Sequence, residues 1–320
     1  MRQLVGRIDA GLLRLGAAAL LLLIAAVLPS VSFMRDTWRY LIFVDISQSM
    51  NARDGRIGAT AVSRIDFSRQ AIAGAIAQLP CGSQVGLGVF TQYRTLLMIK
   101  PVEICAHIDD VNATLANIDG RMRWNDSSEV AKGVSWAIRA ARQVGDSSAV
   151  VFLTDGHEAP PLRADLPPIF DEVSKGITGG LLVGVGGATP TPIPRTDRLD
   201  SMMGYWRAED VVQGPLGSDH LSARAQDYLM TLAPKAGLSY LGLDAVDDLG
   251  AALRDARFAV RAPVPTDLRW LPLGAALLLL LWQYRPQWPQ RPLSRPALPA
   301  TQGVGEAPPV RRDSPRSHAP

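Results

Sequence analysis

The sequence lacks three features that mark common classes of protein. Its formal net charge is only +3 over 320 residues, and no basic stripe is interleaved with aromatic side chains, which argues against nucleic acid as a partner. It has no phosphate-binding G-x-x-x-x-G-K-[ST] loop, and the glycines within 184–187 lack the spacing of a dinucleotide site. Histidine is scarce and scattered, at His107, His157, His220 and His318. No serine therefore has an evident catalytic base, and hydrolysis is the weaker hypothesis.

Cysteine is equally scarce, because the chain has only Cys81 and Cys105. They flank two β-rich apolar runs, at 85–90 and 95–102, which a short polar turn joins in the pattern of a β-hairpin. Both cysteines are equally far from the centre of that turn, near position 93, so the hairpin register brings the two sulfurs opposite each other. In an oxidising compartment this arrangement predicts a disulfide. The alternative is a pair of buried free thiols.

Charge is absent from two long apolar segments. Residues 15–33 form a segment long enough to cross a bilayer as a helix, and Arg2, Arg7 and Arg14 precede it. Residues 270–284 contain a run of leucines with tryptophan and tyrosine at the ends. We interpret both as transmembrane helices of a bacterial inner membrane, with residues 1–14 in the cytoplasm and residues 34–269 in the periplasm. For the first segment the alternative is a cleaved signal peptide.

The region between these segments alternates predicted strands and helices. Helical spacing of apolar residues predicts helices over 64–79, 106–118, 128–144, 221–233 and 247–258, with a short one near 169–176. Apolar β-rich runs predict strands at 41–44, 149–153, 180–186 and 239–243. Such alternation favours a doubly wound, mainly parallel α/β sheet, with the hairpin supplying one antiparallel edge strand. Residues 285–320 are rich in proline and lack apolar periodicity, which predicts a disordered cytoplasmic tail.

Oxygen-bearing side chains follow two of the predicted strands. Asp45, Ser47 and Ser49 come directly after the run 41–44, and Asp155 follows the run 149–153. Ligands of doubly wound folds bind beyond the carboxyl ends of the strands, where these residues lie. Carboxylate and hydroxyl oxygens are the ligands that hard cations prefer. The alternative is that these residues serve only as turn and helix-capping residues.

The D-x-S-x-S at 45–49 resembles the signature of the von Willebrand factor A (VWA) family, whose metal-ion-dependent adhesion site binds an acidic group of a partner. The T-D-G at 154–156 resembles the family's second motif, and Ser128 stands where the family usually carries a threonine ligand. Serine keeps the hydroxyl but loses the methyl that restricts its rotamer. The resemblance covers residues 40–258. It implies one divalent cation, Mg2+ with Ca2+ or Mn2+ as the alternatives, held by Asp45, Ser47, Ser49, Ser128 and Asp155.

Shorter patterns resemble two membrane-anchored bacterial branches of that family. The Pro-Ile-Pro at 192–194 is similar to Bat-type proteins, and this resemblance implies work with a MoxR-type ATPase in stress tolerance or complex assembly. The cysteines around the hairpin and the Gly-Tyr-Trp at 204–206 resemble the MxaL type of methanol-oxidation gene clusters. That resemblance implies a non-catalytic role in maturation of, or Ca2+ insertion into, a quinoprotein methanol dehydrogenase.

The segment 188–218 is long and has no clear periodicity, so we expect it to supply specificity for the client protein. The residues expected to contact a partner are His157, Glu158, Tyr205 and Trp206. For His157 the alternative is an exposed loop histidine without a role.

Overall fold

The computed structural model describes residues 2–145, 148–161 and 179–285. The chain divides into two compact units, one made of Met1–Leu28 with Arg269–Pro320 and the other of Pro29–Leu268. The predicted short helix at 169–176 and all but the first residue of the predicted tail lie outside the described residues.

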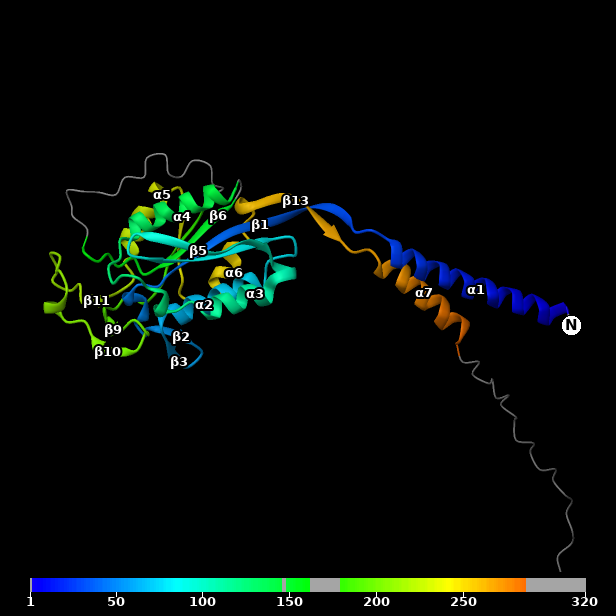
Figure 1. The fold of residues 1–320 in the computed structure, drawn as a ribbon, viewed down its shortest axis with the longest axis horizontal. Helices are drawn as coiled ribbons and strands as arrows, with labels where there is room; N and C mark the ends of the chain where they lie inside the picture. The colour runs from blue at the N-terminus through cyan, green and yellow to red at the C-terminus, as the bar shows by residue number, and fades with distance from the viewer. Residues whose placement is uncertain (1, 146–147, 162–178, 286–320) are drawn as a thin grey trace, which may run out of the picture. The chain divides into compact units, whose positions relative to one another are not determined.

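A seven-stranded sheet runs through the Pro29–Leu268 unit (Figure 1). Its strand order is β12 (Ser239–Gly242), β7 (Gly180–Gly184), β6 (Ala149–Thr154), β1 (Val31–Asp45), β4 (Gln84–Thr91) and β5 (Arg94–Glu103), with β13 (Ala259–Thr266) also paired to β1. The first five of these strands are parallel, and β5 and β13 are antiparallel to their neighbours. The mainly parallel sheet and the hairpin at its edge are confirmed.

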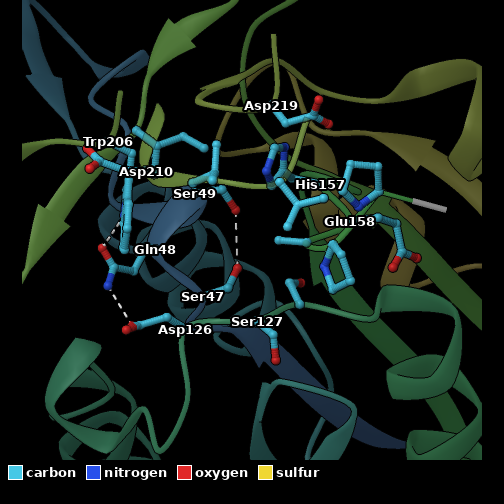
Figure 2. Close-up of a pocket in the computed structure, with 17 residues that line it drawn as sticks. Ser47, Gln48, Ser49, Asp126, Ser127, His157, Glu158, Trp206, Asp210 and Asp219 are labelled. Atoms are coloured by element: carbon cyan, nitrogen blue, oxygen red, sulfur yellow. Dashed lines mark hydrogen bonds between the residues drawn. The ribbon is translucent and has the colours of Figure 1, made fainter. Parts of the chain in front are cut away.

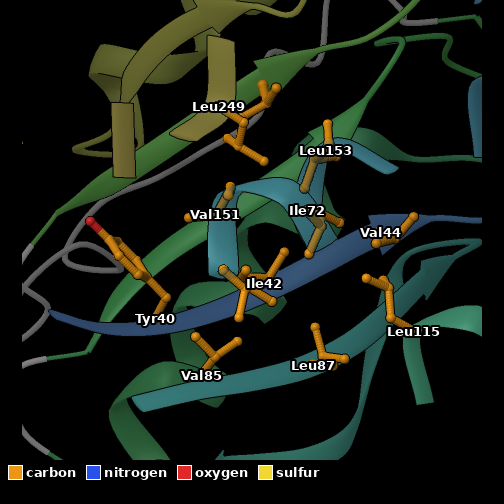
Figure 3. Packing of buried hydrophobic residues seen from close by; sticks show 14 of the residues in the cluster. Tyr40, Ile42, Val44, Ile72, Val85, Leu87, Leu115, Val151, Leu153 and Leu249 are labelled. Atoms are coloured by element: carbon orange, nitrogen blue, oxygen red, sulfur yellow. The ribbon is translucent and has the colours of Figure 1, made fainter. Parts of the chain in front are cut away.

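Helices cover both faces of the sheet (Figure 1). On one face lie α2 (Arg64–Ile76), α3 (Ile104–Ala116) and α6 (Asp248–Leu253), and on the other lie α4 (Val130–Val144) and α5 (Gln226–Lys235). In the central strand, Tyr40, Ile42 and Val44 pack into the first layer (Figure 3). Leu41 and Phe43 point into the second layer. Because both faces are buried, β1 shows a continuous apolar run instead of alternation.

Two sequence-based boundaries are wrong because of long-range strand pairing. The apolar segment predicted as a span over 15–33 ends its helix at Val27, and residues from Val31 onward belong to β1. The first part of β1, from Val31 to Trp38, pairs with β13, which the sequence pattern did not reveal. Similarly, α5 begins at Gln226 instead of 221, because β11 (Leu221–Ser222) pairs with β8 (Thr191–Pro192). Smaller differences occur at α2, which ends at Ile76, and at α6, which ends at Leu253 before a 3-10 turn, η4 (Ala256–Phe258).

The segment 188–218, which shows no clear periodicity in the sequence, contains short elements. After β8 come β9 (Pro194–Thr196) and β10 (Met202–Tyr205), which pair with each other, and then the 3-10 turn η3 (Ala208–Asp210). Further short elements are η1 (Gln48–Asn51), the paired β2 (Gly55–Ile57) and β3 (Thr60–Val62), and η2 (Gly120–Met122). Residues 188–218 therefore form an ordered segment, which we call the insertion.

Cys81 and Cys105 form the predicted disulfide, with their Cα atoms 5.3 Å apart. Beside it, the Glu103 carboxylate accepts hydrogen bonds from the backbone N–H groups of Gly82 and Ala106, both at 2.7 Å. Within the described residues, the side chains of Cys81, Glu103 and Cys105 form a group of three potential metal ligands that lie close together. Because the disulfide uses both sulfurs, we do not interpret the cluster as a metal centre.

The other unit contains α1 (Arg2–Val27) and α7 (Trp270–Gln283). Arg14 donates a hydrogen bond to Gln283 at 3.3 Å, and its guanidinium lies 4.2 Å from the ring centroid of Trp282. Leucines of both helices are exposed, as Leu13 and Leu278 illustrate. Within the described parts of the chain, no helix has both the length and the apolar character that crossing a bilayer requires.

Candidate functional site

Three of the predicted ligand residues lie where β1 ends. Asp45 is fully buried, and its carboxylate accepts hydrogen bonds from the Ser47 backbone N–H at 2.8 Å and from the Thr154 hydroxyl at 2.6 Å. The first bond closes a tight turn, after which η1 begins. This turn places the Ser47 and Ser49 hydroxyl oxygens 3.1 Å apart, facing each other (Figure 2).

Asp155 and Ser128 join this group from other parts of the fold. Asp155 follows β6, which runs parallel to β1, so both aspartates lie at the same edge of the sheet. Ser128 is held by two backbone hydrogen bonds with Ala159, at 2.8 Å and 2.7 Å. The Ser128 hydroxyl is buried and has no hydrogen-bond partner in the described structure. An unpaired buried hydroxyl costs about 1–3 kcal/mol, so this oxygen is suited to binding a ligand.

Sequence reasoning missed Arg64, which is fully buried at the start of α2. Its guanidinium donates to Asp155 at 2.6 Å and to Asp54 at 2.6 Å and 2.9 Å. It also donates to the Ser222 hydroxyl at 2.7 Å. A Cβ on Gly186, where φ is +97°, would lie 2.4 Å from the Arg64 Nε, so glycine lets the backbone pass close to the guanidinium. An arginine beside an N-cap serine looks like a surface residue in the sequence, so no local signal reveals this role.

The charges of this cluster do not balance. It holds three carboxylates, those of Asp45, Asp54 and Asp155, and a single guanidinium, so ionisation of all three would leave two negative charges uncompensated. Burial and then the charge of Asp155 raise the pKa of Asp45 to about 7, although hydrogen bonds from Thr154 and Ser47 oppose the change. Burial also works against ionisation of Asp54, but its hydrogen bonds with Arg64 and the charge of Arg64 outweigh burial and lower its pKa. A divalent cation would relieve the repulsion, so the residues fit a metal site.

Ser47, Ser49 and Ser128 line a cavity of about 310 Å³, and the Ser47 and Ser49 hydroxyls face each other there (Figure 2). Other lining residues come from the insertion and from the loop that follows Asp155. Of the predicted partner contacts, His157, Glu158 and Trp206 line this cavity. Tyr205 is not among the lining residues, and its side chain is exposed on β10.

Gln48 ties the insertion to the loop after β1, and sequence reasoning missed it too. Its side chain is almost fully buried, and its carbonyl oxygen accepts hydrogen bonds from the Trp206 indole at 2.8 Å and from the Thr196 backbone at 3.2 Å. Its amide donates to Asp126 at 2.6 Å (Figure 2). Gln48 occupies an unspecified position of the D-x-S-x-S pattern, so the motif gives no signal for it.

Glu158 lies on the opposite side of the cavity from Gln48 (Figure 2). Its carboxylate accepts hydrogen bonds from the Tyr228 hydroxyl at 2.6 Å and from the Ala131 backbone at 3.2 Å. Burial raises the pKa of Glu158 to about 7, and these hydrogen bonds only partly oppose the change. Glu158 therefore titrates near neutral pH beside the cavity.

No protein-family model matches the sequence, and no curated protein matches it either. Solved structures do match. A serine-substituted form of an aerotolerance-related membrane protein from Bacteroides fragilis is 18% identical, with 69% of this chain and 98% of that chain covered and a TM-score of 0.50. BatB from Bacteroides thetaiotaomicron is 19% identical, with 68% and 96% covered and a TM-score of 0.49. A von Willebrand factor type A protein from Catenulispora acidiphila is 12% identical, with 72% and 45% covered and a TM-score of 0.44.

At these identities the comparisons concern the fold alone. The Pro29–Leu268 unit has a mixed α/β fold with a mainly parallel sheet, and the chain shares its fold with the aerotolerance-related membrane protein. What the site binds must therefore follow from the chemistry of its own residues.

Proposed function

We propose that this chain is a VWA-type protein that holds a divalent cation and uses it to bind an acidic residue of a partner protein. The observation that carries the proposal is the unpaired, buried hydroxyl of Ser128, a residue that lines the same cavity as Ser47 and Ser49. With Asp45 and Asp155, these residues would hold the cation, and the bound cation would supply the positive charge that a carboxylate needs. Mg2+ is favoured over Ca2+ or Mn2+ because few carboxylates converge here.

A binding role is favoured over hydrolysis. The described hydrogen bonds of Ser47 and Ser49 connect neither hydroxyl to a histidine ring. His157, which lines the cavity, contacts Asp155 through its backbone N–H at 3.0 Å. A serine nucleophile would need a base within hydrogen-bond reach.

The test compares three variants by calorimetric titration with Mg2+. Asp45→Ala should abolish Mg2+ binding, whereas Asp219→Asn, which alters another cavity-lining carboxylate, should keep it. Ser128→Ala removes an unpaired hydroxyl, so it should weaken Mg2+ binding while leaving the metal-free protein at least as stable as before. Unchanged Mg2+ affinity in Asp45→Ala would overturn the proposal.

Anchoring to the bacterial inner membrane, with the Pro29–Leu268 unit in the periplasm, is part of the proposal. The exposed leucines of α1 and α7 support attachment to lipid, and the disulfide suits an oxidising compartment. A reporter that is active only in the periplasm should be active when fused after Gly250 and silent when fused after Arg295. The opposite pattern would refute this topology.

Two biological roles are consistent with these features. The fold shared with an aerotolerance-related membrane protein supports a Bat-type role beside a MoxR-type ATPase. The Gly-Tyr-Trp pattern, whose Trp206 lines the cavity, supports the MxaL-type role in maturation of a methanol dehydrogenase. Under the second role, deleting the gene leaves the dehydrogenase polypeptide at its normal level but poor in Ca2+. A full Ca2+ content in the deletion strain favours the Bat-type role.

A further inference from the structure

We propose that the cavity selects a carboxylate that carries a bulky apolar group, and that it disfavours a ligand with a second acid. On a partner protein this describes an aspartate or glutamate next to a large apolar side chain, with no further acidic residue beside it. The inference rests on the proposed metal-dependent binding and adds to it the chemistry of the neighbouring residue.

Apart from its serines and acidic residues, the cavity has a largely apolar lining. The apolar residues are Ile193, Trp206, Val211 and Val212 of the insertion with Pro160 and Pro161 of the loop that follows Asp155. A volume of about 310 Å³ is at the small end of the range for small-ligand sites, roughly 300–1,000 Å³. One acidic group and one large apolar neighbour would fill this space.

The charged residues around the cavity are acidic. None of the described lining residues is lysine or arginine, whereas Asp126, Glu158, Asp210 and Asp219 all line the cavity. Arg123 pairs with Asp126 and Arg207 with Asp210, but the Asp219 carboxylate accepts a described hydrogen bond from the Gly214 backbone N–H. A carboxylate ligand therefore depends on the cation for a positive partner, and a second acid would be repelled.

The apolar wall is held in place before any ligand binds. The Trp206 backbone N–H donates to Ile193 at 3.0 Å, its indole donates to Gln48, and Arg195 lies 4.7 Å from its ring centroid. A wall fixed in this way loses little conformational entropy on binding, so its apolar surface contributes to selectivity.

The experiment titrates the purified full-length protein, in detergent, with three small acids at saturating Mg2+ and again with EDTA. Acetate supplies the acid alone, 3-phenylpropionate adds an apolar group, and 2-phenylsuccinate adds a second acid. In Mg2+, 3-phenylpropionate should bind at least about 10-fold more tightly than acetate, because it buries an aromatic ring. It should also bind more tightly than 2-phenylsuccinate, and EDTA should abolish binding of all three.

Two variants test whether the apolar wall causes the preference for 3-phenylpropionate over acetate. The double variant Val211→Ser with Val212→Ser should reduce the ratio of the 3-phenylpropionate and acetate affinities by about 10-fold or more. Leu216→Ser changes an apolar residue of the same insertion that is 90% exposed and does not line the cavity, so it should keep the ratio. Using the ratio removes any common effect on metal affinity.

The outcomes separate this inference from the proposed function. Equal Mg2+-dependent affinity for acetate and 3-phenylpropionate, or tighter binding of 2-phenylsuccinate, overturns the inference and leaves the metal-dependent site standing. Absence of Mg2+-dependent binding for every acid overturns both. Binding of 3-phenylpropionate that survives EDTA also overturns both, because the cavity would then recognise the ring without the cation.

Discussion

Replacing Arg64 with methionine should strongly destabilise the Pro29–Leu268 unit. Methionine has a similar length but no charge, so the variant leaves the carboxylates of Asp155 and Asp54 without their cation. The side chains of Arg64 and Asp155 are fully buried, and that of Asp54 is 15% exposed. Water therefore cannot replace the lost hydrogen bonds at Asp155.

The magnitude follows from this burial. Removing one member of a buried ion pair costs about 3–5 kcal/mol, because the remaining charge stays desolvated. Natural domains have a free energy of unfolding of about 5–15 kcal/mol, so the loss is a large share of the total. With an m-value of about 3 kcal/mol/M in urea, the unfolding midpoint should fall by roughly 1–1.7 M.

Urea denaturation followed by circular dichroism measures this shift, and Arg207→Met is the matched control. Arg207 pairs with Glu209 at the surface, where both side chains are more than two-thirds exposed, so its loss should cost less than about 1 kcal/mol. Adding Asp54→Asn to Arg64→Met removes the unpaired negative charge of Asp54, so the double variant should be no less stable than Arg64→Met alone. A midpoint shift for Arg64→Met as small as that of the control would refute the reasoning.

Three further predictions concern other parts of the unit. Replacing Cys81 and Cys105 with alanine opens a loop of 24 residues in sequence separation, which should lower stability by about 3 kcal/mol; an unchanged urea midpoint would contradict this. Glu158→Gln should raise the thermal midpoint at pH 8 but not at pH 4, and an equal effect at both pH values would count against the burial argument. Gln48→Leu should cost about 1–3 kcal/mol by leaving buried polar groups unpaired, and it should shift tryptophan emission to the red as Trp206 loses its partner. Gln78→Leu, at an exposed position in the turn after α2, is the control, and an equal loss of stability in both variants would contradict the role of Gln48.

The pH dependence at Glu158 has a definite sign. Its pKa is about 7 in the folded protein, against an ordinary value of 4.5. Between these values the folded protein binds more protons than the unfolded chain, so stability falls as pH rises through this window. Above pH 7 the carboxylate is ionised in a desolvated position, at a cost of at most about 3 kcal/mol. Glutamine cannot ionise and can still accept the hydrogen bond from Tyr228, so it gains stability only at the higher pH.

The elements that could be predicted from the sequence are those specified by local pattern. The continuous apolar run that ends at Asp45 identified the central parallel strand, and the run that ends before Asp155 identified its neighbour. Parallel strands end at the same edge of a sheet, which is why two aspartates that are distant in sequence could be placed together. Equal spacing from a hairpin turn was enough to pair Cys81 with Cys105.

What the sequence could not show depends on contacts between distant segments. The first part of β1 pairs with β13, yet it directly follows an apolar helix, so its apolar residues merge with those of the helix into one predicted span. The insertion forms short strands whose pairing partners are also short, and two or three residues carry no detectable periodicity. Arg64 is a polar residue at a helix start, and only the folded chain brings Asp155 and Ser222 to it.

Arg64 and Gln48 together explain why the loop after β1 has a fixed shape before any cation binds. Arg64 reaches Asp155 and lies 3.4 Å from the Ser49 carbonyl oxygen, whereas Gln48 binds Trp206 of the insertion and Asp126 of the loop before α4. The hydroxyls of Ser47 and Ser49 therefore lie between the hydrogen-bond networks of Arg64 and Gln48, and neither hydroxyl takes part in them. A site held in this way loses little conformational entropy on binding. Since Gln48 belongs to the same loop as Ser47 and Ser49 and also holds Trp206, its loss would release both the loop and the apolar wall, so partner affinity should depend on Gln48 although it binds neither metal nor carboxylate.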